Sequence, residues 1–101
     1  MSISSEIRGE TGRIVLADIF DFTVQDDFHQ IVSGVLNNNK INHLTVDISG
    51  VTFIDSSGIR LLLLLNKNAV SAGKSLILTN CPDGLREVFS IGGFDAILKI
   101  R

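Results

Sequence analysis

The segment that most constrains this chain lies at its centre, where a short apolar run meets a polar turn and then a leucine-rich stretch. Residues 51–54 have the composition of a β-strand, and residues 61–65 belong to a pattern typical of a helix. Between them stands the turn Asp55-Ser56-Ser57-Gly58, built from residue types preferred at helix N-termini. The segment therefore predicts a strand that ends at a turn and passes directly into a helix.

Strand-like and helix-like stretches alternate along the rest of the chain. Residues 6–8 and 13–17 predict a β-hairpin punctuated by Gly9 and Gly12. The further expected elements are a helix over 24–36, a strand over 43–48, the central helix as far as residue 70 or 72, a strand over 75–79, a helix from Pro82 to the glycines at 92 and 93, and a strand over 96–100. This order predicts an α/β fold: a mixed sheet with an antiparallel N-terminal hairpin and otherwise parallel strands, with helices packed on it.

Two of the expected strand-to-helix junctions should lie at the same end of the sheet. In such sheets the functional loops cluster beyond the carboxyl ends of the strands. The turn at Asp55 occupies one junction, and residues 18–23, which include Asp21, occupy the other. We therefore expect Asp21 and the Asp55 turn to face each other.

Composition excludes several classes of protein. A chain of 101 residues should form one domain, residues 1–101, with a modest core. Its net charge of −2 and scattered basic residues argue against a nucleic-acid partner. The N-terminus lacks the apolar core of a signal peptide, and the longest apolar run is far below the roughly 20 residues that span a bilayer. Because a lone Cys81 excludes an internal disulfide, we expect a cytoplasmic protein without membrane insertion.

The Asp55 turn could serve as a plain helix cap, worth about 1 kcal/mol, although its two serines and glycine exceed what one cap requires. A nucleophilic serine would need a histidine base, but His29 lies within a predicted helix and His43 opens a predicted strand. Asp26 and Asp27 are adjacent and do not share a helix face, so they make no metal site. No glycine-rich phosphate-binding loop occurs. We therefore expect no catalytic residue, no metal and no cofactor.

Other residues near the junctions have structural explanations. Asp21 suits the N-cap of the first helix, and Phe20 and Phe22 suit core or edge positions. Arg60 suits a solvated position on the central helix. It nevertheless lies within a turn of Ser56, where it could touch a partner.

The sequence Phe-Ile-Asp-Ser-Ser-Gly-Ile at residues 53–59 resembles the anti-sigma-factor antagonist (STAS) family. The resemblance continues through the leucine helix and the strand over 76–78 to the helix and glycines over 85–94. Upstream, residues 16–32 fit the family's second strand and first helix, with Asp21 at the family's acidic position.

Two features depart from the family pattern. Asp18-Ile19 stands where the family often has a glycine followed by an acidic residue, and no residues after Arg101 supply the family's usual last helix. An apolar patch left uncovered there would favour weak self-association.

The resemblance implies a small non-enzymatic switch. Members of the family bind a partner through the face around this turn. A serine kinase of the anti-sigma type phosphorylates the first serine after the aspartate, and a PP2C-like phosphatase reverses the modification. Carried onto this sequence, the phosphorylation site is Ser56, a choice that composition and periodicity leave open between Ser56 and Ser57. The partner-binding residues are then Asp21, Asp55, Ser57, Gly58 and Arg60.

The resemblance is compatible with several downstream processes: sigma-factor release, stress signalling, or control of biofilm or exopolysaccharide production. Two other kinds of function fit the same fold. One is a sensor that binds a nucleotide or another small ligand, and the other is a scaffold subunit of a larger complex.

Overall fold

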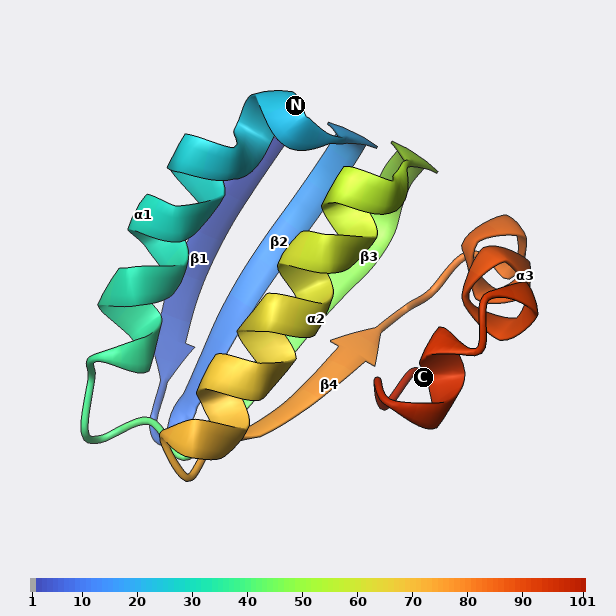
Figure 1. Cartoon of the computed structure of the whole chain (residues 1–101). Coiled ribbons are helices and arrows are strands. Elements are labelled where there is room, and N and C mark those ends of the chain that lie inside the picture. Colours follow the sequence, from blue (N-terminus) through green and yellow to red (C-terminus); the bar gives the residue numbers. More distant parts are fainter. Residues whose placement is uncertain (1) are drawn as a thin grey trace.

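A computed structural model describes residues 2–101 and contains a four-stranded sheet (Figure 1). In chain order the elements are β1 (Ser2–Arg8), β2 (Thr11–Phe20), the 3-10 turn η1 (Phe22–Val24), α1 (Gln25–Leu36), β3 (His43–Ile54), α2 (Ser56–Ser71), β4 (Ser75–Thr79), α3 (Asp83–Ile91) and the 3-10 turn η2 (Phe94–Ala96). The strands lie in the order β1-β2-β3-β4, with β1 antiparallel to β2 and the other pairs parallel. The predicted mixed sheet is confirmed.

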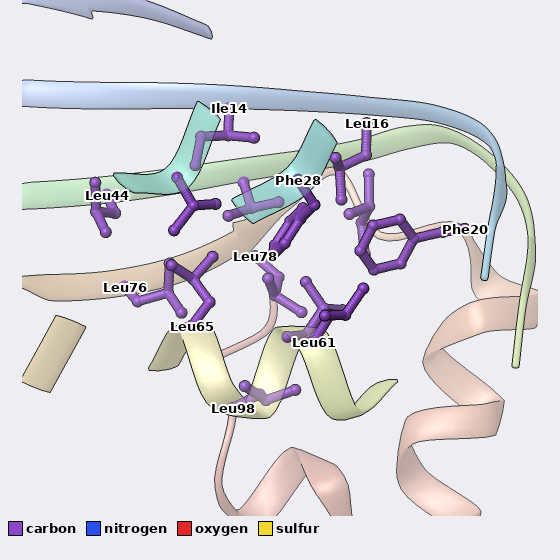
Figure 2. Close-up of a cluster of buried hydrophobic side chains, with 14 of the residues drawn as sticks. Ile14, Leu16, Phe20, Phe28, Leu44, Leu61, Leu65, Leu76, Leu78 and Leu98 are labelled. Carbon is purple, nitrogen blue, oxygen red and sulfur yellow. The ribbon is translucent and has the colours of Figure 1, made fainter. Parts of the chain in front are cut away.

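Two helices, α1 and α2, lie side by side across one face of the sheet, whereas α3 lies beyond β4 (Figure 1). Alternate side chains of β2 point toward these helices, because successive residues of a strand face opposite sides. Figure 2 shows Ile14 and Leu16 directed toward Leu61 and Leu65 of α2, and all four are buried. The core therefore fills the layer between the sheet and the helices.

The helices begin and end within a residue or two of their predicted bounds. Helix α2 ends at Ser71, and Gly73 follows with a left-handed backbone (φ 75°), which glycine adopts without steric cost. Pro82 occupies the N-cap position of α3. The 3-10 turn η1 precedes α1 because Asp21 caps that turn rather than the α-helix itself.

Strand β3 is continuous, so the two runs predicted over 43–48 and 51–54 form one strand. Its pairing with β2 shifts register twice, between Val15 and Ala17 and between Asp18 and Ile19. Asp18 has a positive φ of 67° at the second shift. This left-handed backbone explains why glycine would suit the position, as the family pattern suggests.

The strand predicted over 96–100 is wrong. After α3, Gly93 reverses the chain with a left-handed backbone (φ 74°), and the next three residues form η2. The Phe94 carbonyl accepts hydrogen bonds from the N–H groups of Ile97 and Leu98. The chain becomes extended again near Ile100, which forms a single bridge with Leu78 of β4. Because Ile97 keeps a helical backbone and the Leu98 N–H donates to the Phe94 carbonyl, the extended conformation does not begin at residue 96.

Candidate functional site

The Asp21 and Asp55 turns lie next to each other. Strands β2 and β3 are parallel neighbours, and their last paired residues are Phe20 and Ile54. Each strand is followed at once by its turn, at the end of the sheet where α1 and α2 begin (Figure 1). The predicted juxtaposition of the two junctions is confirmed.

Gly58 allows these two turns to pack closely because it has no side chain. A β-carbon at this position would overlap the carbonyl oxygen of Phe20 and would lie 2.8 Å from Cγ1 of Ile54 and 2.9 Å from Cδ2 of Phe20. These distances are shorter than real β-carbon contacts. The first turn of α2 can therefore approach the end of β2 only with glycine here.

Both aspartates act as caps. Oδ1 of Asp55 accepts a hydrogen bond of 3.0 Å from the Gly58 N–H, and Oδ1 of Asp21 accepts one of 3.0 Å from the Thr23 N–H. The Thr23 hydroxyl also donates to Asp21, and these bonds lower the pKa of Asp21 below its usual value. The predicted capping role of Asp55 is confirmed, whereas Asp21 caps η1, the 3-10 turn that precedes α1, and not α1 itself. Partner binding by either carboxylate remains a hypothesis.

The two serines differ in exposure. Ser56 is the first residue of α2 and is exposed, whereas Ser57 is half-buried. Within residues 2–101, neither hydroxyl makes a hydrogen bond. The first N–H groups of a helix also lack partners in the helix and favour a nearby negative charge. Ser56 is therefore the more accessible hydroxyl at a position that tolerates an anion.

A largely apolar hollow of about 400 Å³ opens beside Ser56, between α2 and α3. Its lining combines the apolar residues Ile54, Ile59, Leu63, Val88 and Phe94 with the polar residues Asp55, Ser56 and Arg60. Such a hollow with a few polar groups at one side can accept an apolar side chain from another molecule.

Three exposed apolar side chains flank the two turns: Ile19, Phe22 and Phe53 are 50%, 66% and 52% exposed. Ile19 and Phe53 are cross-strand partners. Phe20 is fully buried, in agreement with its interpretation as a core aromatic. The same interpretation of Phe22 as a core or edge aromatic is wrong, because this side chain is exposed. Phe22 lies in η1, before the helical pattern of α1 begins, so periodicity could not orient it. Exposed aromatic and aliphatic residues of this kind are typical of protein-binding surfaces.

Sequence reasoning missed a buried carboxylate on the face of the sheet away from α1 and α2. Asp47 of β3 is 5% exposed. It accepts hydrogen bonds from Arg13 (2.6 Å), the Ser49 N–H (2.9 Å) and the Asn80 amide (3.2 Å). Burial acts to raise the pKa of Asp47, but the bonds from Ser49 and Asn80 and the charge of Arg13 outweigh it, and the pKa is lowered. The sequence feature that could have indicated this buried carboxylate is Asp47 itself, a single acidic residue within a β-rich run.

We expect Asp47→Asn to be less stable than wild type by about 2 kcal/mol at neutral pH, because it removes a buried, hydrogen-bonded charge. This loss is smaller than the roughly 3–5 kcal/mol of a fully buried broken pair, because the Arg13 side chain is 40% exposed. The lowered pKa makes the carboxylate stabilising above the unfolded pKa of about 3.9, and this stabilisation is lost as the pH falls further. Urea unfolding at a series of pH values should therefore show the difference narrowing below about pH 4.

A difference between Asp47→Asn and wild type that stayed constant with pH would contradict this account. Asp95→Asn, which changes an exposed aspartate on η2, is the matched control and should leave stability unchanged at every pH.

Neither histidine lies at the Asp55 turn. His43 begins β3, at the opposite end from that turn, and its Nδ1 lies 2.8 Å from the Ser75 hydroxyl, while His29 is exposed on α1. Over residues 2–101, no three His, Cys, Asp or Glu side chains are grouped as a metal site would require. In the same part of the chain, no helix combines the length and apolarity needed to cross a membrane.

The family model described as "Mlab, STAS domain" matches residues 3–99. A STAS-domain containing protein of Pseudomonas aeruginosa (strain UCBPP-PA14) is 29% identical over 92 residues, which are 91% of this chain and 89% of that protein.

Solved structures with the same fold come from different functional contexts. The phosphorylated form of the Bacillus cell fate determinant SpoIIAA matches with a TM-score of 0.76 and 21% identity, over 99% of this chain and 91% of that one. A sulfate transporter family protein from Wolinella succinogenes matches with a TM-score of 0.78 and 18% identity, over 90% of this chain and 75% of that one. At these identities the matches establish a shared fold and leave the function to be argued from the site.

Proposed function

This chain belongs to the STAS-domain family, and from that premise we propose that it is a non-enzymatic protein-interaction switch controlled by phosphorylation of Ser56. The unphosphorylated form binds a partner through the end of the molecule that carries the Asp21 and Asp55 turns. Phosphorylation releases the partner, and dephosphorylation restores binding. The process belongs to bacterial partner switching in the cytoplasm.

The observation that carries the proposal is the setting of the Ser56 hydroxyl. It is exposed, it makes no hydrogen bond within residues 2–101, and it stands at the N-terminus of α2 beside an apolar hollow. The exposed Ile19, Phe22 and Phe53 lie around the same pair of turns. A modifiable group next to apolar contact area is what a charge-controlled interface requires.

The modification changes the interface more than it changes the fold. A phosphoserine adds about −1.5 to −2 charge. The helix N-terminus favours such a charge by about 0.3–1 kcal/mol, so the domain stays folded. A partner that buries a neutral serine would instead have to bury an unpaired charge, which costs several kcal/mol. The interface effect is larger, and binding is lost without unfolding.

The partner classes follow from the reaction. A serine kinase of the anti-sigma type forms the bond from Oγ of Ser56 to the γ-phosphorus of a nucleoside triphosphate, while the bond to the β,γ-bridging oxygen breaks and the hydroxyl proton passes to a base of the kinase. A PP2C-like phosphatase returns the serine by hydrolysis. SpoIIAA, an anti-sigma factor antagonist of the same fold, is known in unphosphorylated and phosphorylated forms, which supports assigning this cycle to the family member described here.

Phosphorylation by such a kinase should modify Ser56 and leave Ser57 untouched, because the first hydroxyl is exposed and the second is half-buried. We expect Ser56→Ala to abolish phosphate incorporation and Ser57→Ala to retain it. Intact-protein mass spectrometry followed by peptide mapping measures both. Phosphate found on Ser57 would overturn the site assignment, and incorporation into neither serine by any kinase of this class would overturn the switch itself.

A further inference from the structure

The proposed switch contains a cation that is well placed to respond to phosphorylation. Resting on the proposed function, we infer that Arg60 is the intramolecular partner of phosphorylated Ser56. In the phosphorylated state the guanidinium reaches back one helical turn, binds the phosphate, and covers part of the hollow between α2 and α3. Arg60 is then part of the switch as well as part of the partner-binding surface.

The positions of the two residues on α2 support this pairing. Ser56 is the first residue of the helix and Arg60 follows four residues later. Residues four apart on a helix lie on the same face, with their β-carbons about 5–6 Å apart. Both residues also line the same hollow. A phosphate on Ser56 and the Arg60 guanidinium can therefore meet without any change in the backbone.

Arg60 is free to take this partner. It is exposed, and among residues 2–101 the ion pairs involve Arg8 and Arg13 but not Arg60. Asp55, the acidic residue of the same hollow, uses Oδ1 as the helix cap for the Gly58 N–H. In the unphosphorylated protein, the Arg60 charge is therefore not committed to a carboxylate.

The chemistry favours a stable pair once the phosphate is present. Guanidinium groups bind phosphate oxygens through two parallel hydrogen bonds. An acidic group four residues before a basic one is also the favoured order on a helix, because each then complements the helix dipole. Asp55 is the carboxylate in the lining and Asp21 lies in the neighbouring turn, whereas the lining residues from α3 and η2, Val88 and Phe94, carry no charge. Among the described residues that line the hollow, Arg60 is the only cation.

The pairing would extend the effect of phosphorylation beyond the serine. A guanidinium drawn toward Ser56 places charge over the apolar lining formed by Ile59 and Leu63. A partner side chain that fits the hollow in the unphosphorylated state would then meet a charged pair in its place. The modification thus closes an apolar contact point in addition to adding charge at one position.

The test uses the full chain with phosphoserine placed at position 56 during translation, so it requires neither a kinase nor a partner. The ³¹P chemical shift is followed as a function of pH in the wild-type background and in Arg60→Gln. A nearby guanidinium favours the dianionic phosphate, so the titration midpoint in the wild-type background should lie about 0.5 pH unit below that in Arg60→Gln. The Arg60 Nε–H resonance should shift over the same pH range.

Matched variants separate pairing from general charge effects. Lys67→Gln removes the same charge from an exposed position of the same helix and should titrate like wild type. Arg60→Lys keeps the charge without the planar fork and should lie between wild type and Arg60→Gln. Equal midpoints for wild type and Arg60→Gln would overturn the pairing. Such a result would leave the proposed switch standing, and a failure of the kinase to modify Ser56 would equally leave the measured pairing intact.

Discussion

Ser56→Asp should bind the partner at least about 100-fold more weakly than wild type, whereas Ser56→Ala should bind within about threefold of wild type. The aspartate introduces a permanent charge at the first residue of α2, beside the apolar hollow. Alanine retains a small neutral group there. Isothermal titration calorimetry with a kinase-like partner of the anti-sigma type measures both affinities.

The size of this effect follows from where the charge would be buried. Each 1.4 kcal/mol corresponds to about tenfold in affinity, and an unpaired charge in an interface costs several kcal/mol. The two neighbouring turns already carry Asp21 and Asp55, which add repulsion to any further negative charge. The helix dipole favours the new charge by only about 0.3–1 kcal/mol. Stability should therefore change little while binding is lost.

A control variant distinguishes a local effect from added net charge. Ser33→Asp changes an exposed serine toward the far end of α1 and should leave the affinity unchanged. Repeating the measurements in about 0.5 M salt tests whether the loss of affinity comes from a charge buried in the interface. Salt screens exposed charges and has less effect on buried ones. If Ser56→Asp bound as tightly as Ser56→Ala, the proposed interface would not include Ser56.

The parts of the fold that the sequence predicts are those controlled by local chemistry. The central turn places Asp55 where its carboxylate can accept the Gly58 N–H, and this bond is present. Helix α2 ends near the predicted residue because Gly73 can adopt the left-handed backbone that terminates a helix. The neighbouring positions of the Asp21 and Asp55 turns also follow from a general property of parallel strands.

The remaining features depend on contacts between residues far apart in the sequence. Asp47 is held by Arg13 and Asn80, which lie 34 and 33 residues away along the chain. The hollow beside Ser56 is lined from α2 and also by Val88 of α3 and Phe94 of η2, and no local pattern places these residues together. The strand predicted over 96–100 is wrong because Ala96 belongs to η2 and Ile97 keeps a helical backbone after it. Apolar composition alone could not reveal this conformation.

Gly58→Ala should destabilise the protein by about 3 kcal/mol, although helix propensity alone predicts the opposite sign. Alanine is preferred over glycine within helices by about 1 kcal/mol. The added methyl group would, however, overlap the Phe20 carbonyl oxygen and press against Ile54. A backbone oxygen at the end of a sheet strand cannot move aside as a flexible side chain can. The packing effect should therefore exceed the propensity effect, and the two turns should separate.

Gly34→Ala in α1 is the matched control, because a β-carbon there would meet no atom within 4 Å. It gains the helix preference without a clash and should stabilise the protein by about 0.5–1 kcal/mol. Urea unfolding of the two variants should thus give free-energy changes of opposite sign. If Gly58→Ala proved as stable as Gly34→Ala, close packing of α2 against β2 could not be what positions Ser56. If it proved unstable but bound the partner with wild-type affinity when folded, the close approach of the two turns would serve the fold and not the interface.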